Sequence, residues 1–259
     1  MMVIPGSGEP APLDRGLLHG EGVFETLHLR PDGPWLLGAH LDRLARSAAA
    51  LELPLPPRGD LTDLALRAAR GWCGEEGALR LIITAAATYA TVAAVPAAVR
   101  RERREGIRLI TADSGIAGRP PWSLAGAKTL SYAENLAARR WARRQGADDV
   151  LWLRTDGHAL EAPTASLVWL TGGTLCTVPA AATGILPGTT AAHLLARAPE
   201  LGLRADERMI TAAELPAAEA RWLASSLRGL AAVRTLDGTE RAASPWTPRL
   251  LDLLGFDRS

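Results

Sequence analysis

The chain has 259 residues, of which 47% are hydrophobic and 22% charged, an ordinary globular composition with room for one large domain or two small ones. A formal net charge of +1 and a pI near 7.9 give no overall field toward nucleic acid or an anionic membrane, so a small-molecule partner is expected. The two cysteines and five histidines lack the spacing of a disulfide framework or of a metal site, so we expect no metal. The sequence shows no export signal and no apolar run long enough for a membrane helix, so we expect a cytoplasmic protein.

The first half of the chain is expected to form strands with two helices packed on them. Alternating or β-branched runs at 23–30 and 34–37, joined by a Pro-Asp-Gly turn, predict a hairpin. Apolar residues at three- and four-residue spacing predict a helix over 36–51, and a second helix is expected over 61–72. Further strands are expected at 78–86, 88–96 and 106–113.

A stretch rich in Gly, Pro and Ser predicts a linker at 116–127, between an N-terminal α/β domain (1–115) and a C-terminal domain (128–259). The C-terminal domain is expected to open with a helix over 132–145 and to continue as a meander of short strands. The expected strands are 148–155, 165–171, 175–178 and 221–226, and the later helices are 189–198, 212–215 and 248–255. Together these elements predict an α+β fold.

Lys128 is the only lysine in the chain, against 28 arginines. A guanidinium stays protonated, whereas an amine can lose its proton and attack a carbonyl to form a Schiff base. A biased composition is the simpler explanation of the count alone. The neighbouring sequence must therefore decide between accident and amine chemistry.

Other segments offer what a Schiff-base lysine needs when it works with pyridoxal phosphate, namely a carboxylate for the pyridine nitrogen and donors for the phosphate. The glycine-containing loop 184–190 runs into a helix whose first N–H groups and hydroxyls could converge on a phosphate; a plain N-capped helix is the alternative. Glu161 is a candidate carboxylate, although a solvated charge is equally ordinary there. Tyr132 follows Lys128 by four residues and would lie near it if a helix begins at this point; otherwise it only packs.

Two arginine-rich stretches raise the alternative of a nucleic-acid module. They are residues 100–105 and the arginines around Trp141. Acidic residues interrupt the first stretch, and the small net charge and 5% aromatic content favour solvated faces or internal salt bridges instead. Nucleic acid is therefore not expected as a partner.

Taken in order, several segments resemble the fold-type IV, pyridoxal-phosphate-dependent class IV aminotransferase family, which includes branched-chain aminotransferases, D-amino-acid aminotransferases and 4-amino-4-deoxychorismate lyases. The resembling segments are DRGLLHGEGVFETLHL (14–29), HLDRLARSA (40–48), KTLSYAENLAA (128–138), GADDVLWLRTDGHALEAPTASLVWL (146–170), GILPGTT (184–190) and ASSLRGLAAV (224–233). The resemblance implies two α/β domains with pyridoxal 5'-phosphate at their interface. It also implies a homodimer in which a partner loop completes the substrate pocket.

The same resemblance assigns roles to individual residues. It implies a Schiff base at Lys128, a phosphate contact from Arg43, and pairing of Glu161 with the protonated pyridine nitrogen. It further implies a hydrogen bond from Tyr132 to the ring oxygen. The remaining phosphate contacts would come from Gly188, Thr189, Thr190 and either Ser225 or Ser226. Candidates for the substrate pocket are His19, Thr26 and Tyr89, each with packing as the alternative.

The subfamily is less sharply indicated. VFET (23–26) lacks the glycine typical of branched-chain enzymes, and residues 81–92 lack both the arginine of D-amino-acid aminotransferases and the Gly/Arg-rich sequence of many lyases. KTLSYAEN, LEAPTAS and SSLRGL favour a 4-amino-4-deoxychorismate lyase, which eliminates pyruvate to give 4-aminobenzoate for folate synthesis. The alternatives are an aminotransferase that acts on D-amino or branched-chain amino acids, and a cofactor-less binding module, although such a module would be expected to have lost Lys128 or Glu161.

Overall fold

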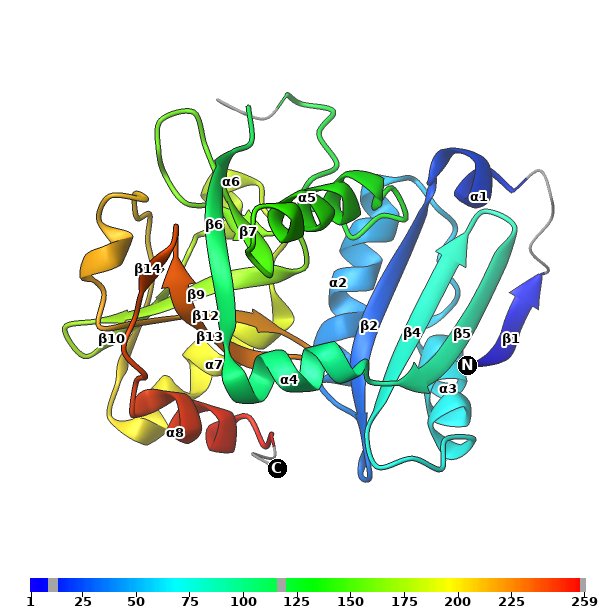
Figure 1. Cartoon of the computed structure of the whole chain (residues 1–259). Helices are drawn as coiled ribbons and strands as arrows, with labels where there is room; N and C mark the ends of the chain where they lie inside the picture. The colour runs from blue at the N-terminus through cyan, green and yellow to red at the C-terminus, as the bar shows by residue number, and fades with distance from the viewer. Residues whose placement is uncertain (9–13, 116–119, 257–259) are drawn as a thin grey trace. The chain divides into compact units, whose positions relative to one another are not determined.

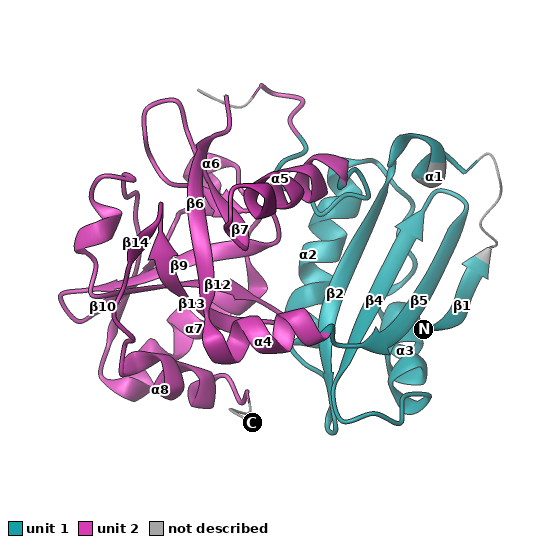
Figure 2. Cartoon of the chain, viewed as in Figure 1, with its two compact units in different colours: residues 1–96, 124–132 teal, residues 97–123, 133–259 magenta. Residues whose placement is uncertain are grey.

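The protein is described from a computed structural model, in which two compact units each contain a β-sheet (Figure 1). The structure describes residues 1–8, 14–115 and 120–256. Unit 1 comprises residues 1–96 and 124–132, and unit 2 comprises residues 97–123 and 133–259 (Figure 2). The mixed α and β content expected from the sequence is confirmed.

Unit 1 is a five-stranded antiparallel sheet, in the order β1-β5-β4-β2-β3. Of its three described helices, α2 and α3 pack on this sheet. The strands are β1 (Met2–Gly8), β2 (Gly22–Arg30), β3 (Gly33–Pro34), β4 (Gly77–Thr84) and β5 (Ala87–Ala94). The helices are α1 (Arg15–His19), α2 (Leu37–Ala50) and α3 (Arg58–Arg70). Val23, Leu27 and Leu29 alternate along β2 and are buried in one core with residues of α2 and α3, which accounts for the three- and four-residue apolar spacing of those helices.

Unit 2 is a nine-stranded mixed sheet in the order β11-β10-β9-β12-β13-β6-β7, with β14 beside β13 and β8 beside β9. The strands are β6 (Ile107–Asp113), β7 (Asp149–Leu153), β8 (Glu161–Ala162), β9 (Ala165–Thr171), β10 (Thr174–Thr177), β11 (Arg204–Glu207), β12 (Ala220–Ser225), β13 (Gly229–Leu236) and β14 (Thr239–Glu240). The α-helices are α4 (Ala97–Glu105), α5 (Ala133–Arg144), α6 (Ala180–Thr183), α7 (Thr189–Arg197) and α8 (Trp246–Leu253).

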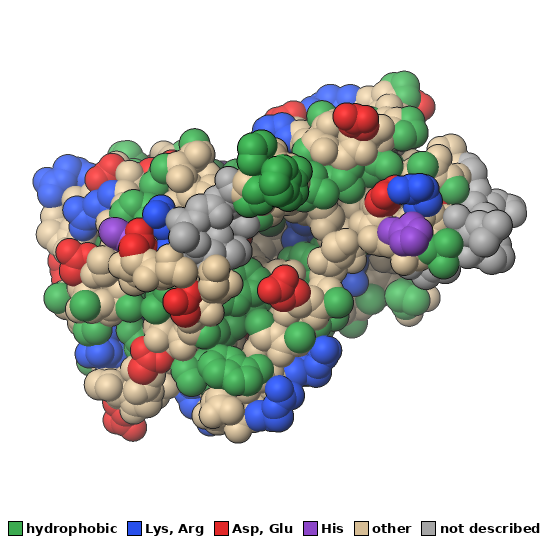
Figure 3. Space-filling view, turned by 90° about the horizontal axis from the view of Figure 1, so that it is seen from above, with side chains coloured by type: hydrophobic (Ala, Val, Ile, Leu, Met, Phe, Trp, Pro, Cys, Tyr) green, Lys and Arg blue, Asp and Glu red, His purple; other side chains and the backbone are tan. Residues whose placement is uncertain are grey.

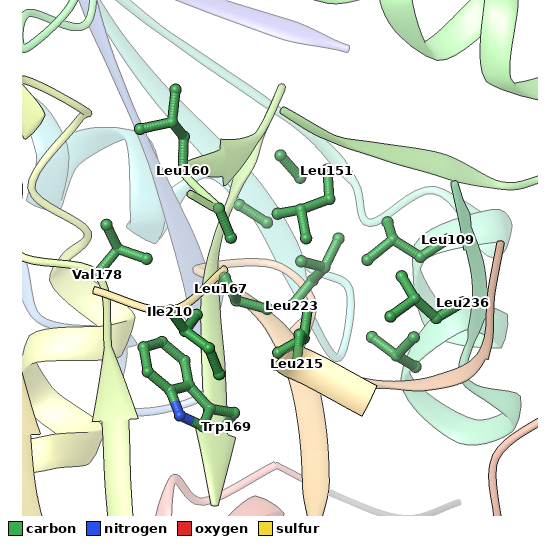
Figure 4. Packing of buried hydrophobic residues seen from close by; sticks show 14 of the residues in the cluster. Leu109, Leu151, Leu160, Leu167, Trp169, Val178, Ile210, Leu215, Leu223 and Leu236 are labelled. Carbon is green, nitrogen blue, oxygen red and sulfur yellow. The ribbon is translucent and has the colours of Figure 1, made fainter. Parts of the chain in front are cut away.

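The central strands of unit 2 are buried almost completely, so they read as continuous apolar runs in the sequence. Leu167 and Trp169 of β9 and Leu223 of β12 are fully buried, and they pack with Leu109 and Leu236 in one cluster (Figure 4). This buried sheet carries the loops at its strand ends.

The division of the chain differs from the expected domain boundary at 116–127, of which residues 116–119 lie outside the described residues. β6, expected in the first domain, pairs in parallel with β13 and β7 and so belongs to unit 2. Residues 124–132, in turn, belong to unit 1, where Thr129 forms a β-bridge with Val23. Both differences arise from hydrogen bonds between distant segments, which local composition does not reveal.

Two further expectations need correction, and two elements were not expected. The expected meander holds only for β9 and β10, because β7 pairs with β6 at the far edge of the sheet. The helix expected at 212–215 is a short 3-10 turn at Leu215–Ala217. The charged run 100–105 lies in helix α4, and the N-terminal Pro/Gly-rich segment contains strand β1, neither of which was expected. Among the described residues, no helix is long and apolar enough to cross a membrane.

Candidate active site

The backbone around Lys128 is fixed as a short extended segment beside β2. Phe24 N donates a hydrogen bond to Lys128 O (3.0 Å), and Leu130 N donates to Gly22 O (2.8 Å). On the other side, Lys128 N donates to the Ser47 hydroxyl of α2 (3.0 Å). The lysine thus has a defined position although no regular element contains it.

The Lys128 side chain is half-buried among aromatic groups. Its Nζ donates to the Tyr132 hydroxyl (3.2 Å), so the expected proximity of these two residues is observed. The same Nζ lies 4.5 Å from the centroid of the Phe24 ring, which packs edge-on against Tyr132. The sequence reasoning did not single out Phe24, although strand alternation places it on the same face of β2 as Thr26. The amine therefore lies in a setting that is partly shielded from water and lined by π-systems.

Arg43 is held in α2 by a buried carboxylate that sequence reasoning missed. Glu25 accepts hydrogen bonds from Arg43 Nε (2.7 Å) and Nη2 (2.8 Å), and its Oε2 lies 2.7 Å from His40 Nδ1. Burial would raise the pKa of Glu25, but the charge and hydrogen bonds of Arg43, together with His40, lower it to about 2. Burial lowers the pKa of His40, so its imidazole is neutral near pH 7. Glu25 sits at an inward-facing strand position between Val23 and Leu27, a signal that could have revealed it.

The substrate-pocket candidates all lie in unit 1. Phe24 of β2, Ile82 of β4 and Tyr89 of β5 are aligned across three strands, so their side chains share one face of the sheet. Thr26 lies two residues further along β2 on that face. His19 is exposed at the end of α1, where its carbonyl accepts a hydrogen bond from Ser131 Oγ at 3.5 Å. The structure thus places Thr26 and Tyr89 on the face that carries Phe24.

In unit 2, Glu161 is tied directly to the loop expected to bind phosphate. Leu186 N donates a hydrogen bond to Glu161 Oε1 (3.0 Å). Glu161 also begins β8 and pairs with Ser166 of β9, which on its other side pairs with Ala224 of β12. Glu161, Ser166 and the sequence-distant Ala224 therefore form one row across three strands.

The loop ends at Gly188, the N-cap of α7, where no side chain supplies a cap. A Cβ at this position would lie 2.1 Å from Ser166 Oγ, so any other residue would require the Ser166 side chain or the loop to move. Thr189 and Thr190 follow as the first, buried residues of α7, and Thr190 Oγ1 is buried with no hydrogen-bond partner among the described residues. This uncapped helix N-terminus has the geometry and dipole orientation that favour an anion.

Ser225 and Ser226 lie at the end of β12, directly after the row position Ala224. Ser226 begins the turn to β13 and is buried. The register of β8, β9 and β12 thereby brings the serines to the same strand ends as Glu161 and Gly188. The candidate residues form two groups, one in each unit, with Lys128 and Arg43 in unit 1.

Some residues of the two arginine-rich stretches form ion pairs inside unit 2. Arg139 of α5 and Arg228 both contact Glu102 of α4 and Asp149 of β7. On the face shown in Figure 3, basic and acidic side chains are interspersed. These observations favour the salt-bridge interpretation of the arginines.

A family model for amino-transferase class IV matches residues 22–236. The chain belongs to this family. Members of the family are pyridoxal-phosphate-dependent enzymes, so the expected enzyme class and cofactor are confirmed.

Individual relatives of this class IV family match nearly the whole length of this chain. A Mycobacterium tuberculosis protein named bifunctional aminodeoxychorismate lyase / D-amino acid transaminase is 39% identical over 252 residues, covering 90% of this chain and 87% of that protein. A solved structure of a hypothetical aminotransferase from Mycobacterium tuberculosis, with alpha-ketoglutarate and PMP bound, has a TM-score of 0.94 and 36% identity and covers 98% of each chain. Its PLP-bound form has a TM-score of 0.93 at 37% identity, again covering 98% of each chain.

The residues of this class IV enzyme fit its cofactor. Lys128 supplies a half-buried amine, and Glu161 supplies a carboxylate fixed by a backbone N–H. The orphaned Thr190 hydroxyl and the uncapped start of α7 offer donors suited to a phosphate. Amine, carboxylate and phosphate donors are the three groups that pyridoxal 5'-phosphate requires of a protein.

Proposed function

We propose that this protein is a 4-amino-4-deoxychorismate lyase, which eliminates pyruvate from its substrate and leaves 4-aminobenzoate. The observation that carries the proposal is the 39% identity, over 90% of the chain, to a protein whose name includes aminodeoxychorismate lyase activity. The geometry around Lys128 and Glu161 supports it, because this chain retains an amine and a carboxylate in defined positions.

Pyridoxal 5'-phosphate, when bound, supplies an electron sink for carbanion chemistry at the carbon that bears the substrate amine. Lys128 would hold the cofactor through its Nζ, and the free amine would take the proton from the ring carbon that bears the substrate amine. Glu161 would keep the pyridine nitrogen protonated, Tyr132 would donate to the ring oxygen, and the aromatic lining by Phe24 would limit access of water to Nζ. Loss of pyruvate from the neighbouring carbon would leave an aromatic product ring.

Each of the two groups of residues contains candidate donors to the cofactor phosphate. Arg43 supplies a guanidinium whose orientation is set by its hydrogen bonds to Glu25. The remaining contacts come from Gly188, Thr189, Thr190 and either Ser225 or Ser226. His19, Thr26 and Tyr89 remain candidates for contacts to the substrate.

Transamination of D-amino acids is a second candidate function. The name of the Mycobacterium tuberculosis relative includes D-amino acid transaminase, and the matching solved structure holds alpha-ketoglutarate with PMP. In this reaction Lys128 would move a proton between the amino-acid Cα and the cofactor, using the same cofactor contacts. The two activities differ only in what fills the substrate pocket. We further propose that the enzyme acts as a cytoplasmic homodimer.

The decisive experiment supplies aminodeoxychorismate to the purified protein in one assay and D-alanine with 2-oxoglutarate in another. We expect 4-aminobenzoate in the first assay, detected by chromatography. Glutamate in the second assay as well would establish the second activity. Glutamate without any 4-aminobenzoate would reject the lyase proposal in favour of transamination.

Lys128→Arg tests the role of the amine in the same assays. Because a guanidinium cannot form the covalent link, we expect the yellow colour and both activities to be lost together. Thr129→Ser, at the next position, is the matched control and should keep the colour and turnover of the wild type. A coloured and active Lys128→Arg protein would refute the proposal, and a colourless, inactive wild type would favour the cofactor-less binding module.

A further inference from the structure

The turn that carries Ser226 is unusually well anchored for a hairpin turn. It consists of Ser226, Leu227 and Arg228, and joins β12 to β13 through the Ser225–Gly229 pair. Gly229 has a φ of 61°, the left-handed conformation that ends a three-residue hairpin loop. Such turns usually lie in solvent and are mobile. Here both Ser226 and Arg228 are buried.

Arg228 connects the turn to two other elements of unit 2. Its Nε donates to Glu102 Oε2 of α4 (2.9 Å), and its Nη2 lies 3.2 Å from Asp149 Oδ2 at the start of β7. Arg139 of α5 approaches the same two carboxylates at 3.6 and 3.4 Å. We name these four residues, Glu102, Arg139, Asp149 and Arg228, the charge cluster.

The two residues flanking Arg228 are fixed as well. Arg103 of α4 donates to Leu227 O (2.7 Å), and its guanidinium lies 4.6 Å from the centroid of the Phe256 ring. A Cβ at Gly229 would lie 2.8 Å from Phe256 Cδ2, so this glycine rests directly on the ring. The whole turn after Ser226 is thus held by α4, β7 and the C-terminal segment.

Stability alone does not account for the charge cluster. Removing two carboxylates and two guanidinium groups from water is costly, and apolar side chains of similar volume often stabilise a fold as well or better. What such a cluster supplies is directional geometry, because each carboxylate oxygen defines where a guanidinium lies. Ser226 is the candidate phosphate donor that directly precedes the anchored residues Leu227 and Arg228, and it lies two residues after Ala224 of the Glu161–Ser166–Ala224 row.

We propose that Arg228 is a positioning residue: through Glu102 and Asp149 it holds the 226–228 turn so that Ser226 can donate to the cofactor phosphate. The inference rests on the proposed function, in which this turn contributes to phosphate binding. It assigns to the charge cluster a role in phosphate recognition, distinct from the covalent attachment at Lys128.

The test compares two aldehydes that differ only in the phosphate, pyridoxal 5'-phosphate and pyridoxal. Their dissociation constants for the cofactor-free protein are measured from the visible absorbance of the lysine-bound form. For Arg228→Met we expect the affinity for pyridoxal 5'-phosphate to fall by about tenfold to a hundredfold, the value of one hydrogen bond to a charged group, and that for pyridoxal to change less than about twofold. Ser226→Ala should give the same selective loss, and the double variant should lose little more than either single variant.

Arg221→Met is the matched control, because Arg221 is a buried arginine at the opposite end of β12 that donates to the Ala218 carbonyl. It should leave the ratio of the two affinities unchanged. If Arg228→Met does not fold, Glu102→Gln loosens the same anchor from α4 and must show the same selective loss.

Equal losses for both aldehydes, or no loss, in a folded variant would overturn the positioning role. Failure of the proposed function looks different. A cofactor-less module would bind neither aldehyde as wild type, whereas a transaminase would give the same affinities as a lyase, because both use the same cofactor contacts, and would be recognised by the missing 4-aminobenzoate. A wild-type affinity for pyridoxal 5'-phosphate in Ser226→Ala would also overturn the inference, because Ser226 would then make no phosphate contact.

Discussion

At the scale of single residues, the proposed chemistry depends on Lys128 and Glu161, whose neighbours in space are separated from them in sequence. The Lys128 backbone N–H donates to the Ser47 hydroxyl and its side chain lies against Phe24, and the Glu161 carboxylate accepts from Leu186 N. The types of the reactive residues could be predicted from sequence, because amine and carboxylate chemistry belong to the residue itself. Phe24 and Ser47 could not, because their roles arise only from packing.

Glu161→Gln is the sharpest test at this scale. The amide oxygen can still accept the hydrogen bond from Leu186 N, so we expect the fold and the bound cofactor to persist. A neutral partner no longer favours a protonated pyridine nitrogen, and kcat should fall about a hundredfold or more. Steady-state kinetics, with the visible spectrum to confirm bound cofactor, measure this.

Glu219→Gln is the control for that change, because Glu219 also accepts from a backbone N–H, that of Gly172. This variant should have the same kcat as the wild type. Unchanged kcat in Glu161→Gln would remove Glu161 from its assigned role.

At the scale of elements, the helices expected over 36–51, 61–72, 132–145 and 189–198 are observed as α2, α3, α5 and α7. Helix α4 was not expected. α4 (Ala97–Glu105) buries Glu102 and Arg103 through ion pairs and a carbonyl contact instead of an apolar stripe. A helix whose buried residues are charged contains few apolar side chains, so its sequence looks like a solvated run. The loop into α7 was recognised, but the close approach of Ser166 to Gly188 was not.

Gly188→Ala tests that approach. The added Cβ would meet Ser166 Oγ, and overpacking of this kind costs about 1–3 kcal/mol. Because the displaced loop carries the phosphate contacts, we expect the affinity for pyridoxal 5'-phosphate to fall about tenfold, measured by absorbance titration.

Gly59→Ala is the matched control, since a Cβ at Gly59 in α3 would meet nothing within 4 Å. It should leave cofactor affinity unchanged and the free energy of unfolding equal or slightly higher. Wild-type cofactor affinity in Gly188→Ala would contradict the proposed place of the phosphate.

At the scale of the whole molecule, Glu25 links stability to pH. The folded protein keeps Glu25 ionised down to about pH 2, whereas the unfolded chain takes up this proton near pH 4.5. The stabilisation is therefore complete above pH 4.5 and is lost as the pH falls toward 2, in total about 3 kcal/mol. His40 acts in the same direction at higher pH, because its lowered pKa makes the unfolded chain bind its proton first.

Urea unfolding at a series of pH values from 7 to 3 measures this dependence. Glu25→Gln should flatten the slope below pH 4.5 and, by removing the buried charge opposite Arg43, cost about 3–5 kcal/mol at pH 7. The control Glu21→Gln alters an exposed carboxylate whose pKa is lowered by Arg15; because solvent screens this pair, the slope should change much less than in Glu25→Gln. Identical slopes in wild type and Glu25→Gln would contradict the assignment.

The sequence by itself determined most of the kinds of element, the candidate roles of Lys128 and Glu161, and the family that the chain resembles, because backbone preference and side-chain reactivity are local properties. Only the tertiary structure decided that β6 belongs to unit 2, that Glu25 binds Arg43 and His40, and that Ala224 joins Glu161 and Ser166 in one row. These depend on hydrogen-bond register and burial between segments separated in the chain, which no local pattern encodes.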